Sequence, residues 1–544
     1  MRWYKESFVY QIYPRSFNDS NNDGIGDLRG IIEKIDYLKD LGVDVIWLSP
    51  IYDSPLDDYG YDIRNYYKVL PEYGTLADFK ELITKLHANG IKLIMDLVIN
   101  HTSDEHEWFL DARKNKNSKY RDYYFFRDKD EINNWTSFFG GDAWGYNPDT
   151  DDYYLHLFSK RQPDLNLANP KVREEIKKIL RFWLDLGVDG FRCDVINIIS
   201  KTEGLPNGKS ILPILRGSEH YLNGPKIHEY LQEFKNDVFK DYNMFTVGEC
   251  VFITPEIALT YIKEGVDELN MVFQFDHMAA DNFLIKWFPT KFKVRKLKKA
   301  LSKWQYKING KGWNSLYFEN HDQPRSINRF GSLKYHKESA KMLATYLFLQ
   351  QGTPYIYQGQ EIGMTNPAYE DLNDYKDIET HNIYKFGRSK FKFSHKRMMR
   401  KIKLMSRDNA RSPMQWRDAL YAGFSESEPW LKVNPNYKEI NVENNLKDDD
   451  SILNYYRKLI KFKKNSKALI YGDYLEHYPK NKHFAMYERI YNNEKYLIVA
   501  SFSEKELKLK SPYDLADFEL VLSNYKENDE KLKPYEVRVY KQQI

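Results

Sequence analysis

The chain has little cysteine and no long apolar run. Cys193 and Cys250 are the only cysteines among 544 residues, so we expect no disulfide framework of the kind that secreted domains carry. No apolar run reaches the length of a membrane-spanning helix. The first residues lead straight into a strand-like segment, VYQIY, without a charged-then-apolar leader. We therefore expect a soluble, cytoplasmic protein with no membrane partner.

An excess of charge of either sign is also missing. The 82 basic and 78 acidic side chains leave a formal net charge of +4. Proteins that bind nucleic acid need clustered Lys and Arg, and the two basic stretches, 294–304 and 395–403, are most simply solvated helix faces. We expect no nucleic-acid partner, and we expect a monomer.

Short β-branched or aromatic runs alternate with longer segments of helical periodicity over the first 360 residues. In the helical segments apolar residues recur every three or four positions, and a Gly closes most of them. Strands are predicted over 8–13, 43–49, 92–98, 189–194, 245–249, 271–275, 315–319 and 354–357. Helices are predicted over 28–42, 76–90, 169–187, 224–239 and 337–352.

Eight strand–helix repeats favour the α/β class, and within it a closed (β/α)8 TIM barrel over an open sheet. Residues 101–168 separate the third strand from the next helix, too many for a loop without structure of its own, so an inserted subdomain is predicted there. The stretch 360–430 is predicted to be irregular. Short alternating runs predict a C-terminal antiparallel β-sandwich domain over 470–544, which leaves 1–100 and 169–469 for the barrel.

Three acidic residues stand at the ends of predicted strands: Asp194 in DGFRCDVIN, Glu249 in FTVGEC and Asp322 in LYFENHDQPR. A charge where a buried strand leaves the core costs free energy unless it is paired or used. Each one alone fits a structural ion pair as well as a functional group. Because TIM-barrel active sites lie at the C-terminal ends of the strands, the three together predict one cleft with carboxylate chemistry.

Four segments resemble the recurring motifs of the α-amylase-type glycoside hydrolases, family 13: DLVINH (96–101), GFRCDVIN (190–197), VGEC (247–250) and ENHDQPR (319–325). QPDLN (162–166) resembles a fifth motif, in the inserted subdomain. Within this family the chain is most similar to oligo-1,6-glucosidases and dextran glucosidases. Glu319 and Gln360 depart from the family pattern of Asn and Glu, and both are predicted to lie near the cleft entrance.

The resemblance implies a retaining mechanism in which Asp194 is the nucleophile, Glu249 the general acid/base and Asp322 the stabiliser of an oxocarbenium-like transition state. Retention needs two carboxyl groups roughly 5–5.5 Å apart, a spacing that the ends of neighbouring barrel strands can supply. The resemblance also implies substrate contacts by Asp58, Tyr61, His101, Phe158, Gln162, Arg192, Val195, His321, Arg407 and Arg411.

Arg192 lies two residues before Asp194 and therefore projects from the same face of the strand. Its guanidinium is predicted to pair with Asp194 and to lower the pKa of that carboxyl group. The same contact would serve as a structural ion pair.

The loop after the first predicted strand alternates oxygen-bearing positions in the pattern D-x-N-x-D-x-I-x-D. Such loops resemble the first part of a calcium loop, although Asp, Asn and Gly clusters are otherwise ordinary turns. Because the similar loop of dextran-glucosidase-like relatives holds calcium, a structural Ca²⁺ is predicted on Asp19, Asn21, Asp23, the carbonyl of Ile25, and Asp27. No cofactor is expected for catalysis.

The two cysteines stand where the relatives usually carry Met. Strand alternation turns both side chains toward the helix layer, on neighbouring strands. We predict two buried thiols that act as small apolar groups; the alternative is a pair whose oxidation disturbs both catalytic strands.

Val195, directly after the proposed nucleophile, bears on the bond that is cleaved. In this family Val at that position goes with α-1,6 linkages, and a branched side chain there would act as a steric filter of about 1–3 kcal/mol. The sequence thus predicts an exo-acting α-glucosidase that releases glucose from the non-reducing end of isomaltose and isomalto-oligosaccharides. The oligosaccharide substrate is its one expected partner.

Three alternatives remain. A trehalose-6-phosphate hydrolase would share most motifs but would need a basic phosphate pocket. A sucrose isomerase, or another sucrose-active or broad α-glucosidase, would use the same intermediate with a different acceptor, although the RLDRD run typical of sucrose isomerases is absent. A non-catalytic glucosidase-like scaffold would normally carry a membrane anchor and would not need all three carboxylates.

Overall fold

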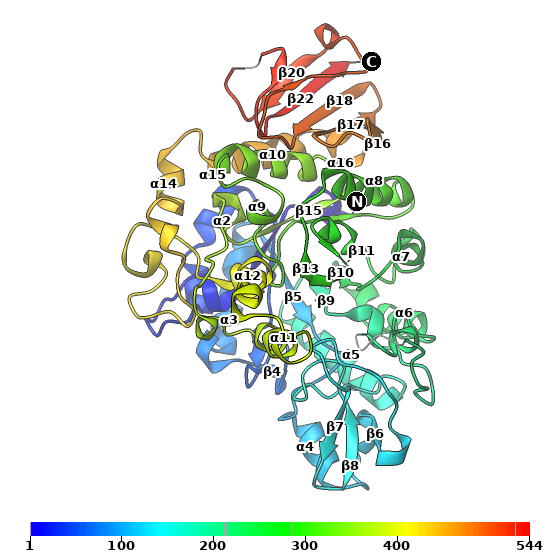
Figure 1. Ribbon diagram of the computed structural model, residues 1–544. Coiled ribbons are helices and arrows are strands. Elements are labelled where there is room, and N and C mark those ends of the chain that lie inside the picture. Colours follow the sequence, from blue (N-terminus) through cyan, green and yellow to red (C-terminus); the bar gives the residue numbers. More distant parts are fainter. Residues whose placement is uncertain (1, 211–214, 284, 528, 544) are drawn as a thin grey trace.

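A barrel of parallel strands forms the centre of the molecule (Figure 1). The computed structural model describes residues 2–210, 215–283, 285–527 and 529–543. Within these residues eight strands form one sheet in the order β11-β10-β9-β5-β2-β1-β15-β14. The strands are β1 (Val9–Ile12), β2 (Val45–Leu48), β5 (Lys92–Leu97), β9 (Gly190–Cys193), β10 (Phe245–Glu249), β11 (Met271–Phe273), β14 (Ser315–Leu316) and β15 (Thr353–Tyr357).

All pairs of neighbouring strands are parallel. The two edge strands, β11 and β14, are joined by side chains. The Ser315 hydroxyl donates to the carbonyl of Val272 over 2.7 Å, and the Tyr317 hydroxyl donates to the carbonyl of Gln274 over 2.7 Å. The predicted barrel of the α/β class is confirmed, with each predicted strand at its expected place in the sequence.

Helices cover the outside of the barrel because each buries one apolar face on the strands. In α5 (Pro170–Asp185), Asn169 caps the first turn, Pro170 occupies the first helical position, and Ile176, Leu180 and Trp183 are buried. The other helices of this layer are α3 (Leu76–Ala88), α6 (Ile227–Asp237), α7 (Pro255–Ile262), α8 (Val294–Ile308) and α10 (His336–Phe348).

The helix predicted over 28–42 is two helices, α1 (Leu28–Ile32) and α2 (Ile35–Leu41). Asp27 caps α1, and Gly30 lies so close to Asn18 that a Cβ there would sit 1.9 Å from the Asn18 carbonyl oxygen. The first turn is therefore held against the loop after β1, and the chain turns before α2 begins.

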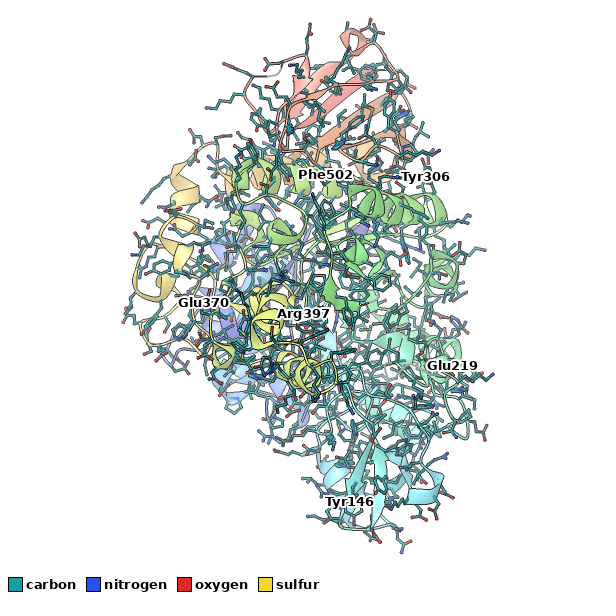
Figure 2. All side chains as sticks on the ribbon, viewed as in Figure 1. Tyr146, Glu219, Tyr306, Glu370, Arg397 and Phe502 are labelled. Atoms are coloured by element: carbon teal, nitrogen blue, oxygen red, sulfur yellow. The ribbon has the colours of Figure 1, made fainter. Side chains whose placement is uncertain are left out.

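The inserted segment after β5 contains helix α4 (Glu107–Lys114) and a three-stranded antiparallel sheet of β6 (Phe126–Arg127), β8 (Asp152–Leu155) and β7 (Trp144–Asn147). Trp135, Trp144 and Leu155 form a core there together with Val195 and Ile198 of the barrel. Tyr146 lies at the outer end of this subdomain (Figure 2). The inserted subdomain thus shares its hydrophobic core with the chain that follows β9.

The stretch predicted to be irregular, 360–430, contains helices, so that prediction is wrong. They are α11 (Ile378–Ser389), α12 (His395–Met405) and the short α13 (Asp408–Arg411). Asp377 caps α11 and Ser394 caps α12, while Met399 and Ile402 pack with Trp287 in a small core of their own. The many exposed Lys and Arg of α12 concealed its buried apolar stripe.

The C-terminal part is an antiparallel sheet of β16 (Asp473–His477), β17 (Phe484–Tyr491), β18 (Glu494–Ser501), β22 (Val537–Gln543) and β20 (Glu519–Ser523), with a two-stranded ribbon of β19 (Leu507–Lys508) and β21 (Lys531–Leu532). Helices α15 (Ile452–Lys464) and α16 (Lys467–Tyr471) precede it. Phe502 lies between this sheet and the barrel (Figure 2), its ring centroid 5.4 Å from that of Tyr346 in α10. Nowhere in the part of the chain that the structure describes is a helix both long and apolar enough to cross a membrane.

Candidate active site

Asp194, Glu249 and Asp322 line one cavity at the C-terminal ends of the barrel strands. The cavity holds about 520 Å³. Its wall also includes six of the side chains predicted to contact substrate: Asp58, Tyr61, His101, Phe158, Val195 and Arg407. The predicted cleft therefore exists as a space that the three acids share.

The guanidinium of Arg192 joins two of these acids. Its Nη1 lies 2.5 Å from Oδ1 of Asp194 and 2.5 Å from Oδ1 of Asp96, and its Nη2 lies 2.7 Å from Oε2 of Glu249. Asp96 and Arg192 are direct neighbours in the pairing of β5 with β9, so both side chains enter the barrel side by side. Asp194 and Glu249 are thus held at the two nitrogens of a single buried cation.

The pKa of Asp194 is raised overall, even though Arg192 lowers it as predicted. Burial is the main cause, and the charges of Glu249 and Asp96 add to it, whereas Arg192 acts in the opposite direction. Burial also raises the pKa of Asp96 to about 6. Three carboxyl groups, those of Asp96, Asp194 and Glu249, therefore share one guanidinium.

Asp322 has the opposite environment. Burial would raise its pKa, but His321, Arg407 and Arg411 together hold that pKa far below its usual range. Because burial lowers the pKa of His321 to about 3, that ring is neutral near pH 7 and the two arginines provide the positive charge. Nη2 of Arg411 lies 2.8 Å and Nη1 of Arg407 3.3 Å from Oδ1 of Asp322. Asp322 is therefore a permanently ionised carboxylate.

One part of the cavity wall is a set of side chains that hydrogen-bond to one another. Arg407 donates to Asp58 over 3.0 Å, and Gln162 donates to the other Asp58 oxygen over 3.3 Å. Burial raises the pKa of Asp58 to about 6, although Arg407 lowers it. The hydroxyl of Tyr61 lies 2.7 Å from Nε2 of His321, with the two rings stacked.

His101 completes this wall. Burial lowers its pKa to about 4, so the ring is neutral, and Nε2 lies 3.1 Å from the carbonyl of Tyr61 and 3.2 Å from the amide of Gln162. The ring of Phe158 lies 5.2 Å from the His101 ring and stacks on Phe138 at 5.0 Å. The predicted contact residues are thus gathered in one place.

Val195 adopts a conformation that the sequence did not predict. Its φ of 36° and ψ of 39° lie in the left-handed region, which is costly for a β-branched residue. Its backbone N–H donates to Oε2 of Glu249 over 3.3 Å. The side chain packs in the core of the inserted subdomain. The strained turn therefore links that core to Glu249.

Asp377 is a site residue that the sequence analysis missed. It is fully buried and accepts from Nη2 of Arg407 over 2.6 Å and from Nε over 3.0 Å, which aims that side chain at Asp58 and Asp322. It also caps α11. The sequence signal was that cap, an Asp directly before a helical period, within the stretch predicted to be irregular.

Glu319 and Gln360 do not lie at the cleft entrance. Both are buried, and neither is among the residues that line the cavity. Glu319 pairs with Arg325 over 3.1 Å and accepts from the backbone and the hydroxyl of Ser326 over 2.8 and 2.6 Å. Their departure from the family pattern therefore concerns the support under the site.

Both cysteines are free and buried, and they stand on neighbouring strands as predicted. Burial raises the pKa of Cys193 to about 12 and that of Cys250 well above its ordinary value. Neutral thiols in an apolar core are poor nucleophiles, so the description as small apolar groups fits.

The predicted calcium loop is folded on itself. Oδ1 of Asp19 accepts from the backbone of Asn21 and Asn22, and Asp27 caps α1. No group of three His, Cys, Asp or Glu side chains arranged to hold a metal occurs among the described residues. The oxygen atoms of this loop are of the kind that Ca²⁺ takes as ligands, side-chain and carbonyl oxygens. The acidic side chains of the loop already accept hydrogen bonds from its own residues.

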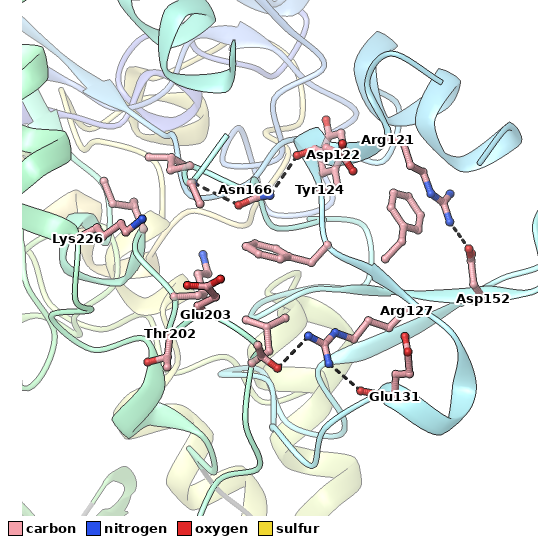
Figure 3. Close-up of a pocket in the computed structure, with 18 of the residues that line it drawn as sticks. Arg121, Asp122, Tyr124, Arg127, Glu131, Asp152, Asn166, Thr202, Glu203 and Lys226 are labelled. Atoms are coloured by element: carbon pink, nitrogen blue, oxygen red, sulfur yellow. Dashed lines mark hydrogen bonds and ion pairs between the residues drawn. The ribbon is translucent and has the colours of Figure 1, made fainter. Parts of the chain in front are cut away.

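A second groove of about 870 Å³ lies between the inserted subdomain and the barrel (Figure 3). Its two arginines are engaged: Arg121 bonds Asp152, and Arg127 donates to the carbonyls of Glu131 and Gly204. None of the three strand-end acids lines this groove. The carboxylate chemistry is therefore confined to the smaller cavity.

Comparisons with known proteins cover the whole chain. A family model described as alpha amylase, catalytic domain, matches residues 11–472. The oligo-1,6-glucosidase of Parageobacillus thermoglucosidasius is 51% identical, with 99% of each chain covered. Among solved structures, the trehalose-6-phosphate hydrolase of Bacillus licheniformis has a TM-score of 0.94 at 44% identity with 100% of each chain covered, and the isomaltulose synthase of Klebsiella sp. LX3 has 0.95 at 42% with 99% covered.

Proposed function

The chain belongs to the alpha-amylase family of glycoside hydrolases, and we propose that it is an exo-acting α-glucosidase that cleaves α-1,6 bonds at the non-reducing end of isomaltose and isomalto-oligosaccharides. The observation that carries the hydrolase chemistry is the pair of carboxyl groups, Asp194 and Glu249, on one guanidinium at the cavity. The linkage follows the oligo-1,6-glucosidase at 51% identity, and Val195 beside Asp194 is in keeping with it.

We propose a retaining reaction in two steps. An oxygen of Asp194 forms a bond to C1 of the glucosyl unit as the bond from C1 to the leaving oxygen breaks, and Glu249 gives that oxygen its proton. A water then attacks C1 and passes a proton to Glu249 while the bond to Asp194 breaks. Asp322, ionised throughout, faces the positive charge that develops on the ring.

The polar wall supports exo action. Asp58 and Arg407 would accept from and donate to hydroxyl groups of the terminal glucose, and Tyr61, His101, Gln162 and Phe158 would enclose it. Asp58, Tyr61, His101 and Gln162 are buried, so this part of the cavity would end the sugar chain, and further sugars would extend toward Glu249.

The pH dependence of substrate binding is expected to follow Asp58. With a pKa of about 6, Asp58 takes up a proton as the pH falls through 6. It then loses its charge toward Arg407, and one of its two acceptor oxygens becomes a donor. Affinity for isomaltose should be constant above pH 7 and should fall by up to about tenfold per pH unit below 6. Calorimetric titration of the Asp194→Asn variant measures this without turnover. An added Asp58→Asn substitution should remove the slope, and a slope that stays would contradict the assignment.

A trehalose-6-phosphate hydrolase is less well supported. Among the described residues that line the cavity, the only Lys and Arg are Lys286 and Arg407. Lys286 pairs with Glu379 over 2.6 Å, and Arg407 pairs with Asp58 and Asp377. Both cations are thus neutralised by carboxylates, which leaves a phosphate without a partner.

A panel of seven glucosides tests the function: isomaltose, panose, dextran, maltose, sucrose, trehalose and trehalose 6-phosphate. Glucose release is measured for each, with the Asp194→Asn variant as the blank. Strong release from isomaltose and panose with little from maltose is expected. Release confined to trehalose 6-phosphate, or dominated by sucrose, would leave the chemistry standing and overturn the substrate.

We also propose that the loop at Asp19, Asn21, Asp23, Ile25 and Asp27 holds a structural Ca²⁺. Removal of the ion with a chelator should lower thermal stability, by about 2.7 kcal/mol when free Ca²⁺ had been 100 times the dissociation constant. Differential scanning calorimetry with EDTA and with added Ca²⁺ measures the shift. Asp23→Ala, which alters an exposed side chain of the loop, should abolish the response; equal melting of the unaltered protein in both conditions would refute the site.

The compartment and assembly stay predictions: a cytoplasmic monomer. Two free, buried thiols suit a reducing compartment.

A further inference from the structure

Phe252 is an exposed and strained aromatic residue at the rim of the catalytic cavity. Its side chain lines the cavity, three residues after Glu249, and the residue is 58% exposed. Its φ of 54° lies in the left-handed region, which a bulky residue rarely adopts. An apolar ring left in water gains nothing from burial that would offset this strain. Such an outlier indicates a functional requirement rather than a packing one.

The backbone around Phe252 is fixed on both sides. The amide of Asn197, a fully buried residue, donates to the carbonyl of Val251 over 3.0 Å and accepts from its N–H over 3.1 Å. On the other side Thr254 caps α7, with Pro255 at the first helical position. The position of the Phe252 ring is therefore set by the turns that follow β9 and β10, the strands that carry Asp194 and Glu249.

The side chains that line the cavity differ in chemistry along the chain. Asp58, His101, Asp322 and Arg407 are polar. The segments after β10 and β11 add, beside Phe252, the apolar Ile253, Phe275, Met278 and Ile285, interspersed with the polar Asp276, Asn282 and Lys286. A sugar ring is amphipathic, since its C–H groups form apolar faces while its hydroxyl groups point outward. An aromatic ring at the rim therefore fits a sugar that lies beyond the scissile bond.

We propose that Phe252 is the platform on which the ring of the leaving sugar stacks, and that it selects substrates whose leaving group is a sugar. The inference deepens the proposed function and rests on it. An α-1,6 bond places the C6 methylene between the two rings and so adds one freely rotating bond. Stacking on a fixed ring limits this freedom and holds the leaving oxygen toward Glu249.

Two substrates distinguish stacking of the leaving sugar on Phe252 from a general contribution of Phe252 to activity. Isomaltose has a leaving sugar, whereas α-glucosyl fluoride has none and needs no platform. Phe252→Ala is expected to lower kcat/KM for isomaltose about tenfold, mainly through KM, and to leave kcat/KM for α-glucosyl fluoride within about twofold. Phe252→Tyr keeps the aromatic face and should retain most activity on isomaltose.

Phe252→Gly tests whether the residue is structural. Glycine adopts a positive φ without strain, so this variant should melt at or above the temperature of the unaltered protein while it loses as much activity on isomaltose as the Ala variant. Phe283→Ala is the matched control, because Phe283 is 62% exposed on the neighbouring hairpin of β12 (Asn282–Phe283) and β13 (Ile285–Pro289) and is not one of the described residues that line the cavity. This substitution should leave kcat/KM unchanged for both substrates.

Each outcome of these measurements either supports or overturns the proposal. Equal losses on isomaltose and α-glucosyl fluoride, or no loss on isomaltose, would overturn the platform. If the unaltered protein hydrolyses α-glucosyl fluoride but not isomaltose, the proposed function fails. In that case the platform is still tested by comparing the loss of kcat/KM that Phe252→Ala causes on α-glucosyl fluoride with its loss on the glucoside of the panel that is cleaved best.

Discussion

Replacing Asp194 by Asn is expected to lower the rate of glucoside hydrolysis by about 10⁴- to 10⁶-fold, as the loss of a nucleophile does in other covalent enzymes. The amide cannot form the bond to C1, while its size and its place beside Arg192 are kept. The measurement is kcat on isomaltose and on α-glucosyl fluoride, and both should fall together. A loss below about tenfold on both substrates would show that Asp194 does not act as the nucleophile.

A second result should accompany the first: the Asn variant should melt no lower than the unaltered protein at pH 7. The folded-state pKa of Asp194 is raised by burial and by the charges of Glu249 and Asp96, so the stability that this group contributes is present below its unfolded pKa and is lost as the pH rises through the raised one. A neutral amide avoids that loss, and its advantage should grow with pH. On this expectation the free enzyme holds a destabilised carboxylate at the proposed reaction centre.

Chemical rescue separates a nucleophile from a positioning group. Asp194→Gly leaves room for azide, which attacks C1 as the leaving sugar departs with the proton of Glu249. The expected product is β-glucosyl azide, of opposite configuration to the substrate, and its formation is followed by NMR. In the unaltered enzyme the first-formed glucose should be the α-anomer; β-glucose would exclude the retaining mechanism.

Replacing Arg192 by Met is expected to abolish activity and to destabilise the fold by about 3–5 kcal/mol, because it leaves buried carboxyl groups without their cation. Arg192 is 1% exposed and contacts Asp96, Asp194 and Glu249. The free energy of unfolding in urea measures the effect. The deficit should be smallest near pH 5 and should grow as the pH rises, since protonated carboxyl groups need no partner.

Arg64→Met is the matched control. Arg64 also pairs with two acids, Asp53 and Glu105, but its side chain is 40% exposed. Exposed pairs are screened by water, so this substitution should cost less than about 1 kcal/mol. Equal effects of the two substitutions would contradict the role given to the buried guanidinium. Arg192→Lys should recover stability but not activity, because one ammonium cannot hold two carboxylates at separate nitrogens.

The barrel and most of the site could be predicted from the sequence because both depend on local patterns. Short runs of β-branched and aromatic residues mark strands, and acids at their ends must meet at one rim once the barrel closes. The features that could not be predicted depend on contacts between segments that are distant in the sequence. The burial of Asp194 beside two other acids raises its pKa by more than Arg192 lowers it, and no property of the segment GFRCDVIN reveals how many carboxylates surround it.

Asp377 and Val195 show two further limits. The helix that begins after Asp377 lies in a stretch that was predicted to be irregular, so the residue that orients Arg407 was read as part of a loop. Val195 has no sequence signal for a left-handed conformation, since β-branched residues avoid it and glycine or asparagine would be expected there. Tertiary contacts impose that conformation, and they become visible only in the folded structure.

Val195 also bears on how such an enzyme can diversify. Its side chain belongs to the core of the inserted subdomain, together with Trp135 and Leu155, while its amide reaches Glu249. A change in that core would reach Glu249, the proposed proton donor, without any contact with sugar. Insertions and repacking in a surface subdomain, ordinarily the most freely varied part of a protein, would therefore act here on the proposed reaction centre. New specificities can be sought in the subdomain as well as in the cleft.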